Sequence, residues 1–235
     1  MYYEEGEIIV KKNQKYVYVA LLYIPSAVGR FVKFWTRYGY SHVTFSFDEN
    51  LETNHAFSRV KEFTPLVGGY TIEHKSYYTS GNDVKIDTII YKIPVTNEEY
   101  NNIKKFIDEI KNDNEYLYNY FSMCTLAVIG GFRVYKAMHC TEFVAKILTM
   151  ISSVKMSKKW YKYLPKDFNN DLKEYTIYDG IMDTRNAKRD DNDYFFQPVT
   201  KKKYRKTYRY IIKEIIYRMI HKRCSPKFDY TKTKL

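Results

Sequence analysis

In the stretch Ser41-His42-Val43-Thr44-Phe45-Ser46-Phe47, polar and apolar side chains alternate from His42 onward. Because successive side chains of a β-strand point to opposite faces, this alternation predicts a strand with one buried and one polar face. His42 lies on the polar face, together with Thr44 and Ser46. A histidine on such a polar face is either an ordinary hydrogen-bonded residue or a member of a functional site. The residues of the neighbouring strand help to distinguish these two alternatives.

The next segment, Glu52–Ser58, is predicted to return beside this strand as the second half of a hairpin. If the turn is centred on Glu49-Asn50, His55 pairs with Thr44. His42 and His55 are then diagonal neighbours on one face, with Cβ atoms about 7–8 Å apart. A register shifted by one residue would place the two histidines on opposite faces, so their pairing depends on the turn.

Outside this hairpin, the sequence predicts strands first and helices afterwards. Further strands are expected at Tyr16–Tyr23, Tyr70–Lys75 and Val84–Pro94, which are rich in Val, Ile and Tyr. Helices are expected after the capping box Thr96-Asn97-Glu98-Glu99, over Cys140–Ile151 and over Tyr204–Arg223, and loops over residues 154–200. This order indicates an α+β fold with one main domain over residues 1–200 and a tail over residues 201–235.

The composition excludes several classes of protein. The chain has 235 residues, of which 45% are apolar, so it can bury a sizeable core and is not a disordered chain. Its three cysteines cannot form a disulfide framework, and no pair has the CxxC spacing of a structural zinc site. HExxH, P-loop and GxGxxG motifs are absent from the sequence. We therefore expect neither a metal nor a cofactor.

Cys140 lies where the loop Tyr135–His139 meets the predicted helix. A thiol in the first turn of a helix is close to unpaired N–H groups and to the positive end of the helix dipole, and both favour the thiolate. Most free cysteines are small buried hydrophobic residues, and that interpretation stays open from position alone. As a nucleophile, Cys140 should react with iodoacetamide faster than Cys124 or Cys224.

A nucleophilic thiol also needs a base, and the base needs an orienting group. His221 lies in the basic tail, His74 in a polar strand, and His139 is adjacent to Cys140, where side chains diverge at a helix start. His42 and His55 remain as the two candidates.

Four segments resemble the circularly permuted, NlpC-type branch of the papain-like cysteine hydrolases, which includes YiiX-like and lecithin–retinol-acyltransferase-like proteins. They are Thr36-Arg37-Tyr38-Gly39-Tyr40-Ser41-His42-Val43, Glu115-Tyr116-Leu117-Tyr118-Asn119-Tyr120-Phe121, His139-Cys140-Thr141-Glu142-Phe143-Val144 and Leu164-Pro165-Lys166-Asp167-Phe168. The histidine precedes the cysteine, which is the permuted order. The resemblance covers about residues 15–170.

The resemblance implies a permuted papain-like fold, with an antiparallel sheet packed on helices, and it implies roles by position. Cys140 would be the nucleophile and His42 the general base. His55 would take the place of the third polar residue, and Tyr118 that of a tyrosine that helps to stabilise an oxyanion. The chain departs from the family pattern in having Thr44 rather than a small residue, and in lacking a proline before Tyr118.

The expected activity is thiol-dependent hydrolysis or acyl transfer at an amide or ester bond through a thioacyl intermediate. The substrate would be a peptide or an acyl lipid. The alternative is a non-catalytic module on the same fold that binds a lipid or peptide, and the reactivity of Cys140 distinguishes the two. The oligomeric state is left open.

The net charge of +12 is concentrated at one end of the chain. Residues 201–235 carry 13 Lys and Arg against two acids, whereas residues 1–200 are close to neutral. Apolar residues at helical spacing, from Tyr204 to Ile220, make the tail a basic amphipathic helix, which is typical of elements that lie on an anionic membrane. Nucleic acid is the less favoured partner. Packing of the apolar stripe on the body is the structural alternative.

The expected location is the cytoplasm, with peripheral attachment to a membrane through the tail. The chain begins with an acidic stretch rather than an apolar signal sequence. Its longest apolar run, around Phe121–Phe132, is about 12 residues, against the roughly 20 needed to cross a bilayer.

Overall fold

The structure is a computed structural model that describes residues 14–25, 30, 34, 37–79, 85–184 and 187–235. At its centre is a six-stranded antiparallel sheet in the order β4-β3-β2-β1-β5-β8. The strands are β1 (Lys15–Leu22), β2 (His42–Ser46), β3 (Asn54–Arg59), β4 (Gly68–Glu73), β5 (Asp87–Val95) and β8 (Thr176–Ile181). The two short strands β6 (Leu117–Tyr118) and β7 (Ala137–Met138) form a separate parallel pair.

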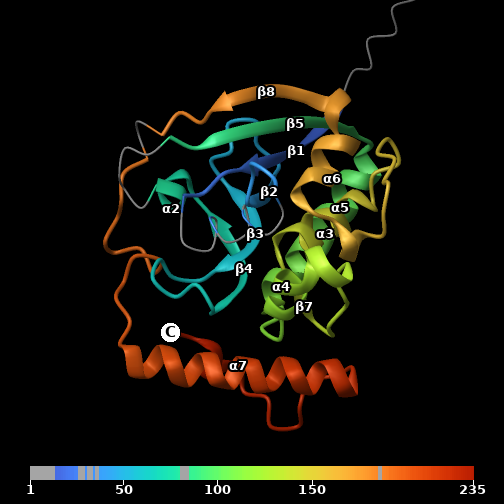
Figure 1. Cartoon of the computed structure of the whole chain (residues 1–235). Coiled ribbons are helices and arrows are strands. Elements are labelled where there is room, and N and C mark those ends of the chain that lie inside the picture. The colour runs from blue at the N-terminus through green and yellow to red at the C-terminus, as the bar shows by residue number, and fades with distance from the viewer. Residues whose placement is uncertain (1–13, 26–29, 31–33, 35–36, 80–84, 185–186) are drawn as a thin grey trace, which may run out of the picture.

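Most helices lie on one side of this curved sheet, as Figure 1 shows for α3, α5 and α6, while α2 lies on the other side. The α-helices described throughout are α2 (Lys75–Thr79), α3 (Asn97–Asn112), α4 (Tyr120–Ile129), α5 (Cys140–Leu148), α6 (Pro165–Asp171) and α7 (Lys201–His221). Three short 3-10 turns are η1 (Trp160–Lys162), η2 (Lys173–Tyr175) and η3 (Tyr230–Thr233). The predicted α+β class is confirmed.

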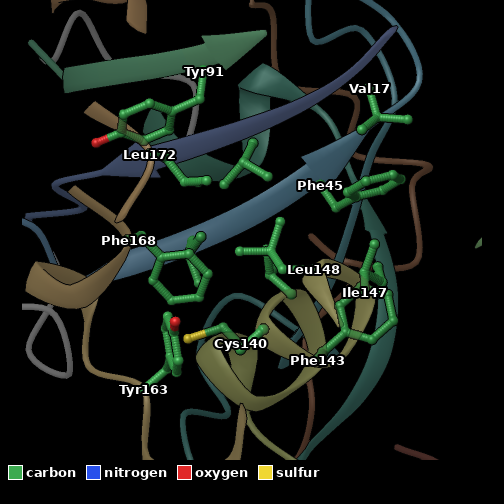
Figure 2. Packing of buried hydrophobic residues seen from close by; sticks show 14 of the residues in the cluster. Val17, Phe45, Tyr91, Cys140, Phe143, Ile147, Leu148, Tyr163, Phe168 and Leu172 are labelled. Carbon is green, nitrogen blue, oxygen red and sulfur yellow. The ribbon is translucent and has the colours of Figure 1, made fainter. Parts of the chain in front are cut away.

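The main core lies between the sheet and α5 (Figure 2). Phe143, Ile147 and Leu148 of α5 are fully buried against the face of the sheet that carries Val17 and Phe45. The expected helix after Thr96 is confirmed with its capping box: the hydroxyl of Thr96 accepts from Glu99 N, and the Glu99 carboxylate accepts from Thr96 N.

Residues 154–200 are not all loop, contrary to the prediction. They contain α6 and the edge strand β8, which pairs with β5 through Asp87 opposite Ile181. All six residues of β8 are exposed or half-buried, so this strand lacks the buried alternating face from which a strand is normally predicted.

The C-terminal segment packs on the body instead of extending from it. Ile211 and Ile215 of α7 are buried in a cluster with Val67 and Leu117. Arg218 is fully buried, and its guanidinium donates to the carbonyl oxygens of residues 115 and 136 at 2.6 and 3.0 Å. The apolar stripe of this helix is therefore largely buried against the body, which is the alternative to membrane binding given above.

Candidate active site

Cys140 is the first residue of α5, and only His139 separates it from β7, so the short strand fixes where the helix begins. Its side chain is only 7% exposed and sits at the edge of the main core (Figure 2). Glu142 caps the helix start, because its carboxylate accepts from His139 N at 3.0 Å. The remaining first-turn N–H groups have no acceptor within the helix, which makes this end electropositive.

His42 is the first residue of β2, and its Nε2 donates to Glu73 Oε2 over 2.8 Å. Glu73 is the last residue of β4, and both side chains are buried. Tyr78, on α2, donates its hydroxyl to the same carboxylate oxygen at 3.2 Å. The strand ends and α2 therefore hold a carboxylate and an imidazole in one fixed arrangement.

The charges of this pair stabilise each other. Burial lowers the pKa of His42, but the negative charge of Glu73 and the side-chain hydrogen bond with Cys140 outweigh it and raise that pKa to about 10. Burial also opposes ionisation of Glu73, yet the charge of His42 holds the pKa of the carboxyl below its usual value. At neutral pH the pair is an imidazolium and a carboxylate.

Cys140 completes the arrangement, because its side chain interacts with His42 through a hydrogen bond and through charge. Since Glu73 occupies Nε2 of the imidazole, Nδ1 is the nitrogen left to share a proton with the thiol. The structure thus brings together the predicted nucleophile and the predicted base.

The predicted third residue, His55, is wrong. Phe45, not Thr44, pairs with His55, so His55 lies on the opposite face of the sheet from His42. There its Nδ1 contacts the Tyr70 hydroxyl at 2.7 Å, and its ring packs against Phe47. Burial, followed by the charge of Lys111, lowers the pKa of His55 to about 4, so this imidazole is neutral.

The register is shifted by the hairpin turn. The predicted two-residue turn is replaced by a longer bend between β2 and β3, in which the Asp48 carboxylate accepts from the backbone N–H groups of Asn50 and Glu52. Leu51, buried in this bend, has the left-handed φ of 56°. The longer bend moves every β3 side chain by one position relative to the prediction.

Glu73 takes the place assigned to His55, and the sequence analysis missed it. The third polar residue was expected on the strand that follows His42, whereas Glu73 lies one strand further along the sheet. Asn54 pairs with Glu73, and the alternation along β3 and β4 then places Glu73 on the face opposite His55. The available signal was that Glu73 is the one acid in the predicted strand Tyr70–Lys75.

Tyr118, the oxyanion candidate, is buried near the site, and its hydroxyl donates to Met123 Sδ at 3.2 Å. Burial raises the pKa of Tyr118 well above its ordinary value, and the charge of Cys140 adds to this shift. The hydroxyl is therefore a neutral donor close enough to feel the thiol, but it is engaged with Met123.

A second buried polar cluster supports the start of α5. The hydroxyl of Ser122 donates to Glu142 Oε1 at 2.9 Å, and the side-chain amide of Asn119 donates to Glu142 Oε2 at 3.3 Å. Nδ1 of His139 contacts the Thr141 hydroxyl, and its Nε2 faces Ser122 at 3.4 Å. Burial lowers the pKa of His139 to about 3, which agrees with its exclusion as the base.

The other two cysteines lack these surroundings. Cys124 is exposed, and partial burial of its thiol raises its pKa. Burial is also the main reason that the pKa of Cys224 rises to about 11.

Among the described residues, no cluster of three or more His, Cys, Asp or Glu side chains is arranged to hold a metal ion. No helix in the described part of the chain is long and apolar enough to cross a membrane. Comparisons of the chain with protein-family models, curated proteins and solved structures give no match.

Proposed function

We propose that this protein is a cysteine-dependent hydrolase or acyltransferase, with Cys140 as nucleophile, His42 as general base and Glu73 as the residue that orients and charges the base. The observation that carries this proposal is the 2.8 Å contact between His42 and Glu73 on a histidine that also interacts with Cys140. Nucleophile, base and orienting group in that order are the requirement for nucleophilic catalysis by a thiol.

The charges around Cys140 suit a thiol nucleophile. An imidazolium that is stabilised by Glu73 attracts a thiolate, and the start of α5 adds the positive end of a helix dipole. A histidine with a neutral partner, such as His55, would supply no such charge.

In the first step, the thiol proton resides on His42 Nδ1, and the Cys140 sulfur attacks a substrate carbonyl carbon. A carbon–sulfur bond forms, and the carbonyl π electrons move to oxygen. The N–H groups of the first turn of α5 are positioned to donate to that oxyanion. His42 then gives its proton to the leaving nitrogen or oxygen as the original acyl bond breaks, which leaves a thioester on Cys140.

In the second step, His42 takes a proton from the acyl acceptor, which attacks the thioester carbonyl. The carbon–sulfur bond breaks, and the thiol regains its proton through His42. With water as acceptor the product is a carboxylic acid, and with another nucleophile the acyl group is transferred.

The order of the chain supports a permuted papain-like arrangement as the fold of this proposal. The base strand β2 precedes the nucleophile helix α5, and that helix packs on the antiparallel sheet. Peptide amides and acyl-lipid esters are the substrate classes that such a site would accept.

Labelling with an activity-based acyloxymethyl ketone probe tests the proposal. Wild-type protein should be labelled at Cys140, and Cys140→Ala should lose the label entirely. His42→Ala and Glu73→Gln should reduce labelling by at least about 100-fold and 10-fold. The matched control is Cys124→Ala, which removes an exposed thiol and should label like the wild type.

Equal labelling of wild type and His42→Ala would contradict the catalytic proposal. Such a result, with a folded protein that still binds an acyl or peptide ligand, would instead favour the non-catalytic binding module.

A further inference from the structure

The outer face of α7 has an unusual composition for a helix that packs on a protein body. At 100° per residue, one straight line along the helix carries Lys202, Lys206, Arg209, Lys213, Ile216 and Ile220. All six side chains are exposed, and Ile220 is 69% exposed. The line therefore begins with four cations and ends with two isoleucines, beside which Met219 is 39% exposed.

The fold does not account for this face. α7 is held by its opposite side, where Ile211 and Ile215 are buried and Arg218 pairs with Glu214 at 2.8 Å. Glu214 is the one acid in this helix, and it is buried, so the exposed cations have no counter-charge within α7. Lysines in the first turn also oppose the helix dipole, which favours anions at that end.

The cationic part of the line borders a groove of about 820 Å³ between α7 and the C-terminal segment. Six of its lining residues are Lys or Arg from α7, and Lys232 and Lys234 come from the opposite wall. Its lining contains no Asp or Glu. The surface is therefore complementary to a dense array of negative groups.

We propose that the outer face of α7 docks on an anionic lipid bilayer, with the helix axis parallel to the membrane. The cations then lie among the anionic headgroups, while Ile216, Met219 and Ile220 enter the boundary between headgroups and acyl chains. Figure 1 shows α7 lying across one end of the molecule. The residues that dock are not those of the buried apolar stripe.

The isoleucines favour a membrane over a nucleic acid. A phosphate backbone would use the cations but would leave Ile216 and Ile220 in water, whereas a bilayer uses both parts of the line. This inference does not depend on the proposed catalytic function, because none of its residues belongs to the site around Cys140.

Flotation of the full-length protein with vesicles tests it. The vesicles contain phosphatidylcholine alone or phosphatidylcholine with 30% phosphatidylserine, about the range in which basic segments respond to surface charge. We expect binding to the anionic vesicles, weakened by salt, and none to the neutral ones. Lys206→Glu with Lys213→Glu should weaken binding about 30-fold, at about 1 kcal/mol for each lysine. Ile216→Ser with Ile220→Ser should weaken it about tenfold.

The matched control is Lys104→Glu with Lys105→Glu, which makes the same charge change on exposed positions of α3 and should leave binding within about twofold. Duplex DNA is the competing ligand, measured with the same variants. Loss of DNA binding in the lysine variant, with vesicle binding unaffected by the isoleucine variant, would overturn the membrane proposal in favour of nucleic acid. If the α3 control variant weakened vesicle binding equally, the membrane proposal would be overturned in favour of non-specific attraction between charges.

Discussion

His42 with Glu73 and His139 with Glu142 are both buried pairs of an imidazole and a carboxyl group, and both lie close to Cys140 in space or in sequence. The first pair is in direct contact at 2.8 Å and is ionised. In the second pair the imidazole Nε2 and the carboxyl Oε1 are 3.6 Å apart, and burial lowers the pKa of His139 to about 3 and raises that of Glu142 to about 8. The second pair is therefore mostly neutral at pH 7.

The difference teaches that a carboxyl group near a histidine does not by itself make a base. His139 is held by Thr141 and Ser122, both neutral, so nothing compensates the cost of charging it in the interior. His42 is held by a carboxylate that Tyr78 also donates to. Cys140 thus has a charged partner in His42 and neutral polar neighbours at the start of its own helix.

The largest effect is expected from Glu73→Gln, which removes the counter-charge of His42. We expect the free energy of unfolding at pH 6 to fall by about 3 kcal/mol, as for other buried pairs that lose one partner. Because the pKa of folded His42 is raised, its contribution is complete below the unfolded value of about 6.5 and is lost as pH rises towards about 10. The difference between wild type and variant should therefore shrink between pH 6.5 and 10.

Urea denaturation at a series of pH values measures this difference, with Glu109→Gln on the exposed face of α3 as control. A difference that stays constant from pH 6.5 to 10 would show that His42 is not charged by Glu73.

The second-largest effect distinguishes His42 from His139 by the reactivity of Cys140. Replacing His42 with Ala should slow alkylation of Cys140 by iodoacetamide at pH 6 by about 100-fold, because the imidazolium partner of the thiolate is lost. His139→Gln keeps a polar group between Thr141 and Ser122 and should change the rate per folded molecule by less than about threefold. Competing alkylation and peptide mass mapping give both rates, and the reverse order would make His139 the base.

A smaller effect is expected from Glu142→Gln, which imitates the protonated carboxyl. Burial raises the folded pKa of Glu142 to about 8, so its contribution to stability is complete below the unfolded value and is lost as pH rises through about 8. The variant should therefore become more stable relative to the wild type as pH rises from 4.5 to 8. Between pH 4.5 and 6.5, the difference in free energy of unfolding between wild type and Glu73→Gln is expected to stay constant. If the difference between wild type and Glu142→Gln also stayed constant over this range, Glu142 would be ionised in the folded protein.

The smallest effect is expected from His55→Gln. His55 is neutral and faces Tyr70 on the other side of the sheet, so the rate of Cys140 alkylation should change by less than about twofold. A loss comparable to that of His42→Ala would restore His55 as the orienting residue.

The pair His42 and Cys140 was predicted by elimination among the histidines and by the resemblance of short segments. Local patterns in the sequence were enough to predict most of the sheet and the capped start of α3. Each of these depends on side chains that alternate or recur at short spacing, which a sequence displays directly. His55 and Glu73 could not be assigned in the same way, because their faces depend on the number of residues in one bend. That number was set by hydrogen bonds to Asp48 and by Leu51 in a left-handed conformation, which no composition rule specifies.

The edge strand β8 was missed, and the packing of α7 was left as one of two alternatives, for a related reason. An edge strand with exposed faces carries no alternation, and an apolar helical stripe reads the same whether it meets a membrane or a protein body. In α7 the deciding contact is long-range, between Arg218 and backbone oxygens about 80 and 100 residues earlier.

Arg218 also determines how far the chain can be shortened. Its guanidinium joins the segments that precede β6 and β7, and β7 ends one residue before His139, the residue that precedes Cys140. A truncated protein that ends at residue 200 would remove the guanidinium donor of the Glu115 carbonyl oxygen and would expose Val67 and Leu117 to water. Expression of residues 1–200 alone should therefore yield an aggregating or protease-sensitive product, and a minimal folded protein would have to retain α7.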